Sequence, residues 1–239
     1  MNSSLTEFSK KYAGKCIGIC GSIILEHRVP DHLYIGNQFC HLLFPERKLL
    51  FEIIEKAAAE QVEITLVFSY IREYMLDYIT ELLDEINRWC EEKRQSVEIV
   101  VNDWGMASLV KKSRRNLIPS LGILLNKRRK DPRIPFKKGE QKWFERNSLN
   151  AGFYRNFLER EYGIQRFEWE SCGYEQQIPP GKNSLHIPFY QTNTSQYCPL
   201  GAVCETGERG RKKLSKKMPG ILYGICTFVS GTFAYDRAV

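Results

Sequence analysis

The chain has 239 residues, of which 43% are hydrophobic and 26% charged. This is the size and composition of one globular domain, and it excludes collagen-like, coiled-coil and disordered chains. No apolar run approaches the roughly 18–20 residues of a membrane-spanning helix, so no membrane span is expected. A net charge of +7 and eight cysteines are the features that need an explanation.

We expect a single barrel-like domain over residues 1–239, with residues 1–12 as a tail. The apolar stretch at 16–25 resembles a signal peptide faintly, but Gly18 and Gly21 interrupt it and charged residues follow at once. We therefore interpret it as a first strand and expect a cytoplasmic protein. In a reducing compartment, surplus cysteines favour buried thiols, metal ligands or redox groups over disulfides.

Helices and strands alternate through the rest of the chain. Apolar residues at helical spacing predict helices over 46–60, 72–93, 104–112 and 147–162. Short apolar runs predict strands over 62–68, 97–101, 117–125, 164–169 and 184–189. This alternation, with nearly continuous apolar strands, is typical of a parallel sheet covered by helices.

The choice lies between an open doubly wound sheet and a β/α barrel. The chain contains neither G-x-G-x-x-G after the first strand nor a Walker A sequence, which favours the barrel. A full eight-unit barrel takes about 250 residues, and about six units are found here. We therefore expect a TIM-barrel-like (β/α) barrel that is short or incomplete, followed by a cysteine-containing segment at 197–228.

The positive charge is concentrated in two segments. Residues 111–146 carry a net charge of +10 and residues 205–217 carry +4, which leaves −7 for the rest. The densest run follows the strand predicted to end at 125, on the face where barrel active sites form. Such a loop either binds anions, including phosphates, carboxylates or RNA, or is a solvated surface run. The candidate anion-binding residues are Lys127, Arg128, Arg129 and Arg133.

The cysteines fall into two groups of four. Cys16, Cys20, Cys90 and Cys172 lie in apolar or unremarkable settings, and the first three are expected to be small buried hydrophobes. The second group lies on predicted loops or beside turns rich in glycine and proline: Cys40, Cys198, Cys204 and Cys226. Four thiolates on such turns can converge on an iron–sulfur or zinc site.

Several motifs occur in an order that resembles the collagenase-like peptidase superfamily. They are Asn102-Asp103-Trp104-Gly105, the run from Leu121 to Lys127, the run from Arg129 to Ile134, and the stretch from His186 to Pro199. The superfamily includes the anaerobic ubiquinone-hydroxylation proteins and RNA-hydroxylation relatives. The resemblance covers roughly residues 30–228.

The resemblance implies a TIM-barrel-related fold and a [4Fe–4S] cluster held by four cysteines. Cys40 matches the early ligand, and Cys198 and Cys204 match two later ones. Relatives carry a Cys-Pro-x-x-Cys segment where this chain has Met218-Pro219, so Cys226 is the candidate fourth ligand. The implied function is oxygen-independent hydroxylation, or a related redox modification, of a small molecule or RNA, in a heterodimer with a related barrel subunit.

Three further residues are catalytic candidates at the predicted barrel mouth: Asp103, Asn126 and His186. Asp103 follows a strand and is either a general base or the cap of the helix that begins at Trp104. Asn126 follows the next strand, and His186 precedes the cysteine segment. Two alternative functions stay open: a cluster-free barrel that binds an anion or RNA, and a peptidase, for which only the adjacent Cys40 and His41 offer a nucleophile and base.

Overall fold

One eight-stranded sheet forms the centre of the molecule in a computed structural model. The structure describes residues 17–20, 32–112, 114–129, 131, 133–134, 138–170, 172, 174–187 and 233–236. The strands lie side by side in chain order. They are β1 (Ile17–Cys20), β2 (His32–Gly36), β3 (Glu63–Val67), β4 (Val97–Val101), β5 (Leu117–Leu121), β6 (Arg166–Glu170), β7 (Lys182–Ile187) and β8 (Phe233–Asp236).

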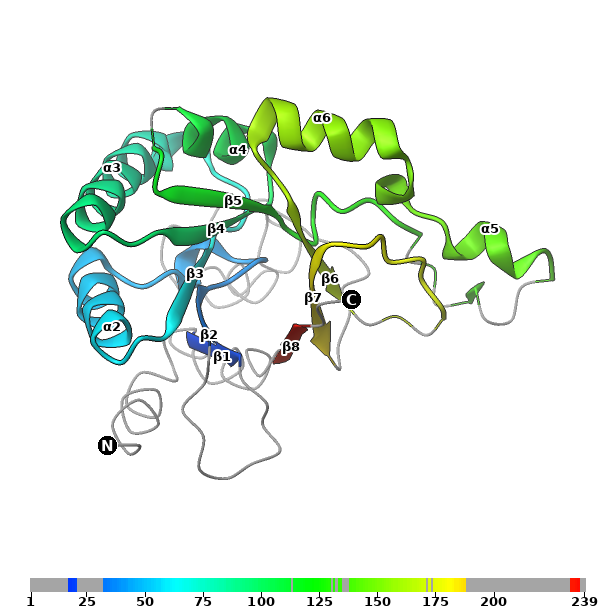
Figure 1. Ribbon diagram of the computed structural model, residues 1–239, viewed down its shortest axis with the longest axis horizontal. Coiled ribbons are helices and arrows are strands. Elements are labelled where there is room, and N and C mark those ends of the chain that lie inside the picture. The colour runs from blue at the N-terminus through cyan, green and yellow to red at the C-terminus, as the bar shows by residue number, and fades with distance from the viewer. Residues whose placement is uncertain are drawn as a thin grey trace, which may run out of the picture.

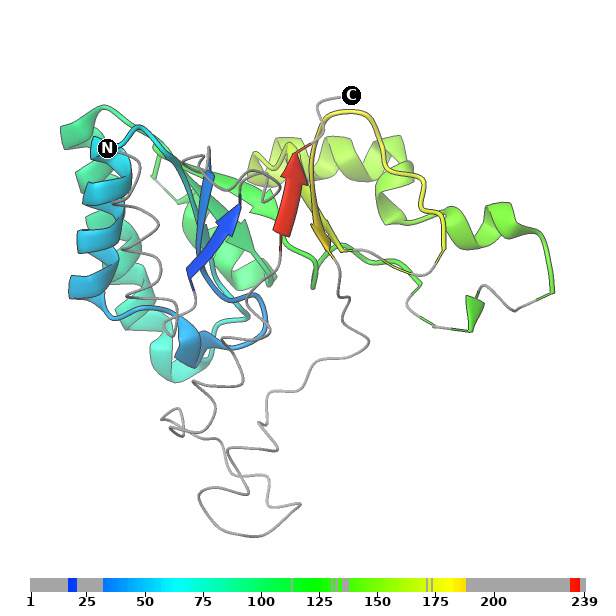
Figure 2. The same ribbon diagram turned by 90° about the horizontal axis from the view of Figure 1, so that it is seen from below.

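The six strands β2 to β7 are parallel and form a curled half-barrel (Figure 1). The two edge strands, β1 and β8, pair antiparallel with β2 and β7 (Figure 2). The protein is therefore an α/β protein whose parallel sheet is consistent with an incomplete (β/α) barrel, as the sequence predicts.

Helices cover the outer side of the curled sheet (Figure 1). The covering helices are α2 (Arg47–Ala59), α3 (Leu76–Lys93), α4 (Trp104–Lys111) and α6 (Gly152–Tyr162), while the short α5 (Gln141–Glu145) projects away from the sheet. Single 3₁₀ turns occur at η2 (His41–Leu43), η3 (Glu73–Met75) and η5 (Ser148–Asn150). The apolar stripe of α3 contains Ile79, Leu82, Leu83, Ile86 and Cys90, all buried. These side chains recur at three- and four-residue spacing, which is why this segment packs as a helix against the sheet.

Alternate side chains along each strand separate two environments. Leu33, Leu66, Ile99 and Phe167 belong to the large apolar core beneath the helices. Their neighbours at alternate positions point to the inner, concave face. That face is largely polar. Its polar side chains are those of His32, Tyr34, Thr65, Glu98, Ser120, Arg166, Glu168, Ser184 and His186. Among the described residues, the ring of Tyr34 also forms a small apolar cluster with Val67 and Val100 on this face.

Several predicted elements differ from the structure. No range was predicted for β2, and Cys40 lies on the connection that follows this strand. Of the predicted first strand at 16–25, residues 17–20 form β1 at an antiparallel edge, and the other residues lie outside the described ranges. The strand predicted over 117–125 ends at Leu121, because a turn begins at Gly122. The carbonyl of Gly122 accepts hydrogen bonds from the N–H groups of Leu125 and Asn126 at 3.1 and 3.0 Å. Helix α5 and strand β8 were not predicted.

Candidate functional site

The carboxyl ends of the parallel strands bring several polar side chains to one edge of the half-barrel. Gln38 follows β2, Asn102 follows β4, Asn126 follows β5, and His186 lies near the end of β7. All four are buried. In β/α barrels this edge carries the active site, because the loops that follow the strands meet there. Two of the predicted catalytic residues, Asn126 and His186, therefore lie at the same edge.

The centre of this edge is a buried pair formed by Glu168 of β6 and His186 of β7. The Glu168 side chain is fully buried, and its Oε2 contacts His186 Nε2. The side-chain nitrogen of Gln38 lies 3.1 Å from the same Nε2. His186 Nε2 thus lies between a carboxylate, which accepts a hydrogen bond, and an amide nitrogen, which donates one. An imidazole in contact with a carboxylate is an arrangement found in general acid–base catalysis.

Tyr34 of β2 fixes the second oxygen of Glu168. Its hydroxyl donates to Glu168 Oε1 at 3.0 Å and lies 3.1 Å from Ser184 Oγ. Burial raises the pKa of Tyr34 well above its usual value, and the neighbouring Glu168 raises it further. The phenol therefore stays protonated and acts as a donor to the carboxylate. Sequence patterns gave no indication of this role for Tyr34.

A second buried carboxylate, Glu98 of β4, lies further along the concave face. Burial raises the pKa of Glu98 to about 7, although the nearby Arg166 works in the opposite direction. Arg166 Nε lies 3.3 Å from Glu98 Oε1 and 4.0 Å from Glu168 Oε1. One guanidinium therefore lies between two buried carboxylates.

The network continues toward the amino end of the strands. The hydroxyl of Thr65 donates to Glu98 Oε2 at 2.8 Å, and Thr65 also contacts His32. Burial lowers the pKa of His32, and the positive charge of Arg166 lowers it further. The concave face thus holds a continuous set of polar contacts from His186 at one edge to His32 at the other, where most barrels have packed apolar layers.

Asn126 supports this network through the backbone. Its side-chain nitrogen donates to the carbonyl of Glu168 at 2.9 Å. Its Oδ1 is buried and has no hydrogen-bond partner among the described residues. Asn126 therefore positions the strand that carries Glu168 and still presents one acceptor at the edge.

The predicted basic loop divides into a buried and an exposed part. The Arg128 guanidinium lies 2.7 Å from Glu170, and both side chains are at most 2% exposed. Lys127, Arg129 and Arg133 are exposed, and Arg133 pairs with Asp131 at 2.9 Å. The surface available to an anion within the described part of this loop therefore comes from Lys127 and Arg129 rather than from Arg128.

Asp103 caps helix α4. Its Oδ1 accepts from the N–H of Met106 at 2.8 Å and its Oδ2 accepts from the N–H of Ile71 at 2.7 Å. This is the alternative that the sequence left open, and it ties the β3–α3 connection to the start of α4. The neighbouring Trp104 is 40% exposed and packs against Tyr162 of α6.

Cys40 lies on the connection after β2, at the same edge as His186. Its N–H donates to the side chain of Asn37 at 2.9 Å, and the side chain is half-buried. The other three predicted ligands, Cys198, Cys204 and Cys226, lie outside the described residues. Within the described ranges, no group of three or more His, Cys, Asp or Glu side chains could hold a metal ion.

Cys90, Cys172 and His41 each contact neighbouring groups of the protein, while the side chains of Cys16 and Cys20 lie outside the described part of the structure. Cys90 is buried in α3, as predicted, and burial raises its pKa to about 11. Cys172 donates from Sγ to the carbonyl of Tyr174 at 3.3 Å. His41 Nε2 shares a hydrogen bond of 2.8 Å with the hydroxyl of Tyr74, so the ring nitrogen is directed to that phenol.

These features define an α/β half-barrel with a buried carboxylate–histidine pair at the carboxyl edge of its sheet. Comparison with protein-family models, with curated proteins and with solved structures found no match. Among the described residues, no helix is long and apolar enough to cross a membrane.

Proposed function

We propose that this chain is an iron–sulfur protein of the collagenase-like peptidase type, which takes part in oxygen-independent hydroxylation or a related redox modification of a small molecule or RNA. The supporting observation is the position of Cys40. It follows a parallel strand at the carboxyl edge, two residues after Gln38, which lies 3.1 Å from His186. A thiolate there would place redox chemistry beside a group able to move a proton.

The donor set is compatible with such a cluster. Cys40 would supply one thiolate, and Cys198, Cys204 and Cys226 would supply the other three, since iron–sulfur clusters are held by four cysteines. When bound, the cluster supplies electron transfer. The residues of this chain provide the remaining functions: Glu168 and His186 hold or release a proton, Tyr34 orients Glu168, and Asn126 offers an acceptor to a substrate.

The proposal also covers the fold family, the partner subunit and the cellular location of the protein. We place the half-barrel with the TIM-barrel-like folds, with the segment 197–228 completing the cluster site. A related barrel subunit would be the partner, because the parallel strands among the described residues form only a half-barrel. A cluster of this kind suits a reducing compartment, so we place the protein in the cytoplasm.

Anaerobic purification tests the proposal directly. We expect coloured protein with about four iron atoms and equal sulfide per chain. Cys40→Ser should lose most of this iron, because one of four ligands is removed. Cys172→Ser is the matched control, since Cys172 is also half-buried on a connection but belongs to the other group of cysteines. Colourless, iron-free protein after anaerobic preparation would refute the proposal.

A second candidate function is anion or RNA binding without a cluster. The observation that favours it is the exposure of Lys127 and Arg129 on the connection after β5, at the carboxyl edge. Binding of this kind weakens steeply as salt increases, because phosphate contacts release counterions. Binding to single-stranded RNA that does not change with salt, or no binding at all, would remove this candidate.

A further inference from the structure

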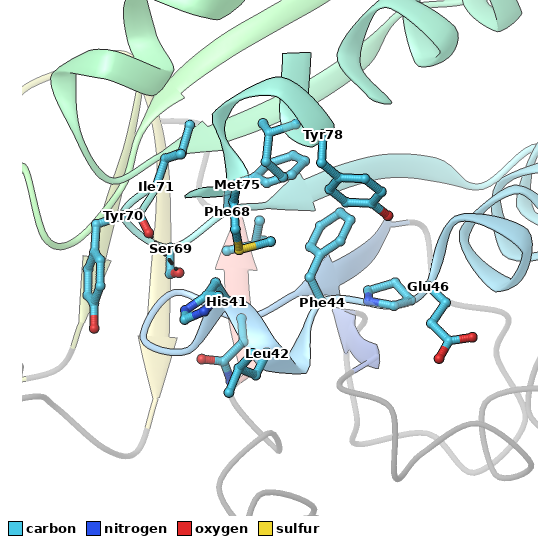
Figure 3. A pocket seen from close by; sticks show the side chains of 14 residues that line it. His41, Leu42, Phe44, Glu46, Phe68, Ser69, Tyr70, Ile71, Met75 and Tyr78 are labelled. Carbon is cyan, nitrogen blue, oxygen red and sulfur yellow. Dashed lines mark hydrogen bonds between the residues drawn. The ribbon is translucent and has the colours of Figure 1, made fainter. Parts of the chain in front are cut away.

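A cavity of about 200 Å³ lies beside Cys40 at the carboxyl edge, between the β2–α2 and β3–α3 connections. Its described lining contains neither Glu168 nor His186, and no residue of the basic loop. Its walls are mainly apolar and include Phe44, Val67, Phe68, Ile71, Met75 and Ile79. Figure 3 shows Phe44, Met75 and His41 directed toward the same space.

The floor of this cavity is held rigidly. Phe44 and Phe68 stack with ring centroids 4.4 Å apart and planes inclined by 23°. The backbone of Phe68 is fixed on both sides, since its N–H donates to Val100 at 3.3 Å and its carbonyl accepts from Asn102 at 2.8 Å. A wall anchored by the sheet in this way does not collapse to fill the space. The cavity is therefore a preformed site.

The lining indicates an uncharged occupant. None of the described residues that line the cavity is Lys or Arg. The neighbouring cations lie outside this lining: Arg47 lies over the ring of Tyr78, and the charge of Arg72 helps to lower the pKa of His41. The only lining carboxylate, Glu46, is exposed to solvent. Burying an ion in such surroundings is strongly unfavourable, whereas burying apolar surface is favourable.

The size and composition of the walls indicate an aromatic ring. An apolar cavity of about 150 Å³ is known to hold benzene, so this one has room for one ring or two fused rings. Aromatic walls favour ring partners through offset and edge-to-face contacts, and the Met75 thioether adds favourable sulfur–ring contacts. Tyr78 also lines the cavity and is 37% exposed, which adds a further ring beside the opening.

We propose that this cavity binds the uncharged aromatic ring system, of one or two fused rings, of a small molecule. The inference goes beyond the iron–sulfur function and does not require it. A chain without a cluster would still bind the ring, and a chain with a cluster could fail to bind it. Iron analysis and ligand binding therefore test the two proposals separately.

The test uses 5-fluoroindole as the probe and follows its ¹⁹F NMR signal with the full-length protein. We expect saturable binding that cyclohexylmethanol, a non-aromatic compound of similar size, does not displace at equal concentration. In protein labelled at the methionine methyl groups, the Met75 methyl signal should shift, whereas the signal of Met106, a fully buried residue of α4 that does not line the cavity, should not. This measurement needs no variant.

Two matched variants sharpen the result. Met75→Trp fills the cavity and should weaken binding at least tenfold. Leu76→Trp adds the same bulk one residue further on, at a position that is 43% exposed and does not line the cavity, and should leave binding unchanged. Absence of saturable binding, equal binding of cyclohexylmethanol, a Met106 shift without a Met75 shift, or unchanged binding by a folded Met75→Trp protein would each overturn the proposal.

Discussion

Replacing Glu98 by glutamine should change how the stability of the protein depends on pH. Glu98 lies on the concave face with only 12% of its side chain exposed, and burial raises its pKa from 4.5 to about 7. The folded protein therefore binds this proton more tightly than the unfolded chain does. Such a group weakens the folded state as pH rises from the unfolded pKa through the folded pKa, and the cost is complete above about pH 7.

The size of the effect follows from the two pKa values. Taking 4.5 for the unfolded chain and about 7 for the folded protein, and about 1.4 kcal/mol per pKa unit, the ionised carboxylate costs about 3 kcal/mol of folding free energy at pH 8. At pH 5 most of this cost is absent, because the folded protein keeps Glu98 protonated; about 1 kcal/mol remains. Between these pH values, wild type should lose about 2 to 3 kcal/mol through this group.

Other groups titrate over the same range, so a difference measurement is needed. Because burial lowers the pKa of His32, its contribution to stability rises with pH and opposes that of Glu98. We therefore compare the free energy of unfolding of wild type and Glu98→Gln, measured by urea denaturation at pH 5 and pH 8. The contributions of groups that titrate in both proteins cancel in this comparison. We expect the free energy of unfolding of the variant, relative to that of wild type, to be about 2 to 3 kcal/mol higher at pH 8 than at pH 5.

Glu52→Gln provides the control for the chemical change itself. Glu52 lies on the exposed side of α2. Its replacement should therefore leave the change in the free energy of unfolding between pH 5 and pH 8 the same as in wild type. If Glu98→Gln parallels wild type as closely as Glu52→Gln does, Glu98 is not buried in the way described, and the account of the concave face fails.

The alternation of helices and strands was predictable because it depends on local periodicity. The run Val97–Val101 specifies its strand to the residue, and the stripe from Ile79 to Cys90 predicts the end of α3 at Lys93, whereas α3 begins at Leu76 and not at the predicted Arg72. The short strand β2 could not be delimited from the sequence, because its five residues, HLYIG, give too few positions to establish a period. Its pairing with β3 supplies the stability that the local sequence does not.

The concave network was only partly visible in the sequence. Strand β6 reads RFEWE, with polar residues at every second position, which indicates one polar face. Periodicity does not show that this face is enclosed, and charged residues in a strand usually point to water. Burial of Glu168 results from the curl of the sheet, which brings β2 within 3.0 Å of β6 through Tyr34, 134 residues away. A contact over that distance in the chain has no local signal.

Two further substitutions separate structural from binding roles at the carboxyl edge. Asn102→Ala should lower the free energy of unfolding by about 2 to 4 kcal/mol, because it removes one buried and one partly buried hydrogen bond that link neighbouring strand ends. Urea denaturation measures this change. Arg128→Ala should also destabilise the fold, by about 3 to 5 kcal/mol, since it leaves Glu170 buried without this guanidinium. Arg129→Ala, at an exposed position of the same loop, should change stability by no more than about 0.5 kcal/mol. If the loop binds RNA, Arg129→Ala should weaken that binding and its salt dependence, because Arg129 and not Arg128 faces the solvent. Loss of RNA affinity in Arg128→Ala with unchanged stability would show that Arg128 leaves Glu170 to contact phosphate, which contradicts the buried ion pair.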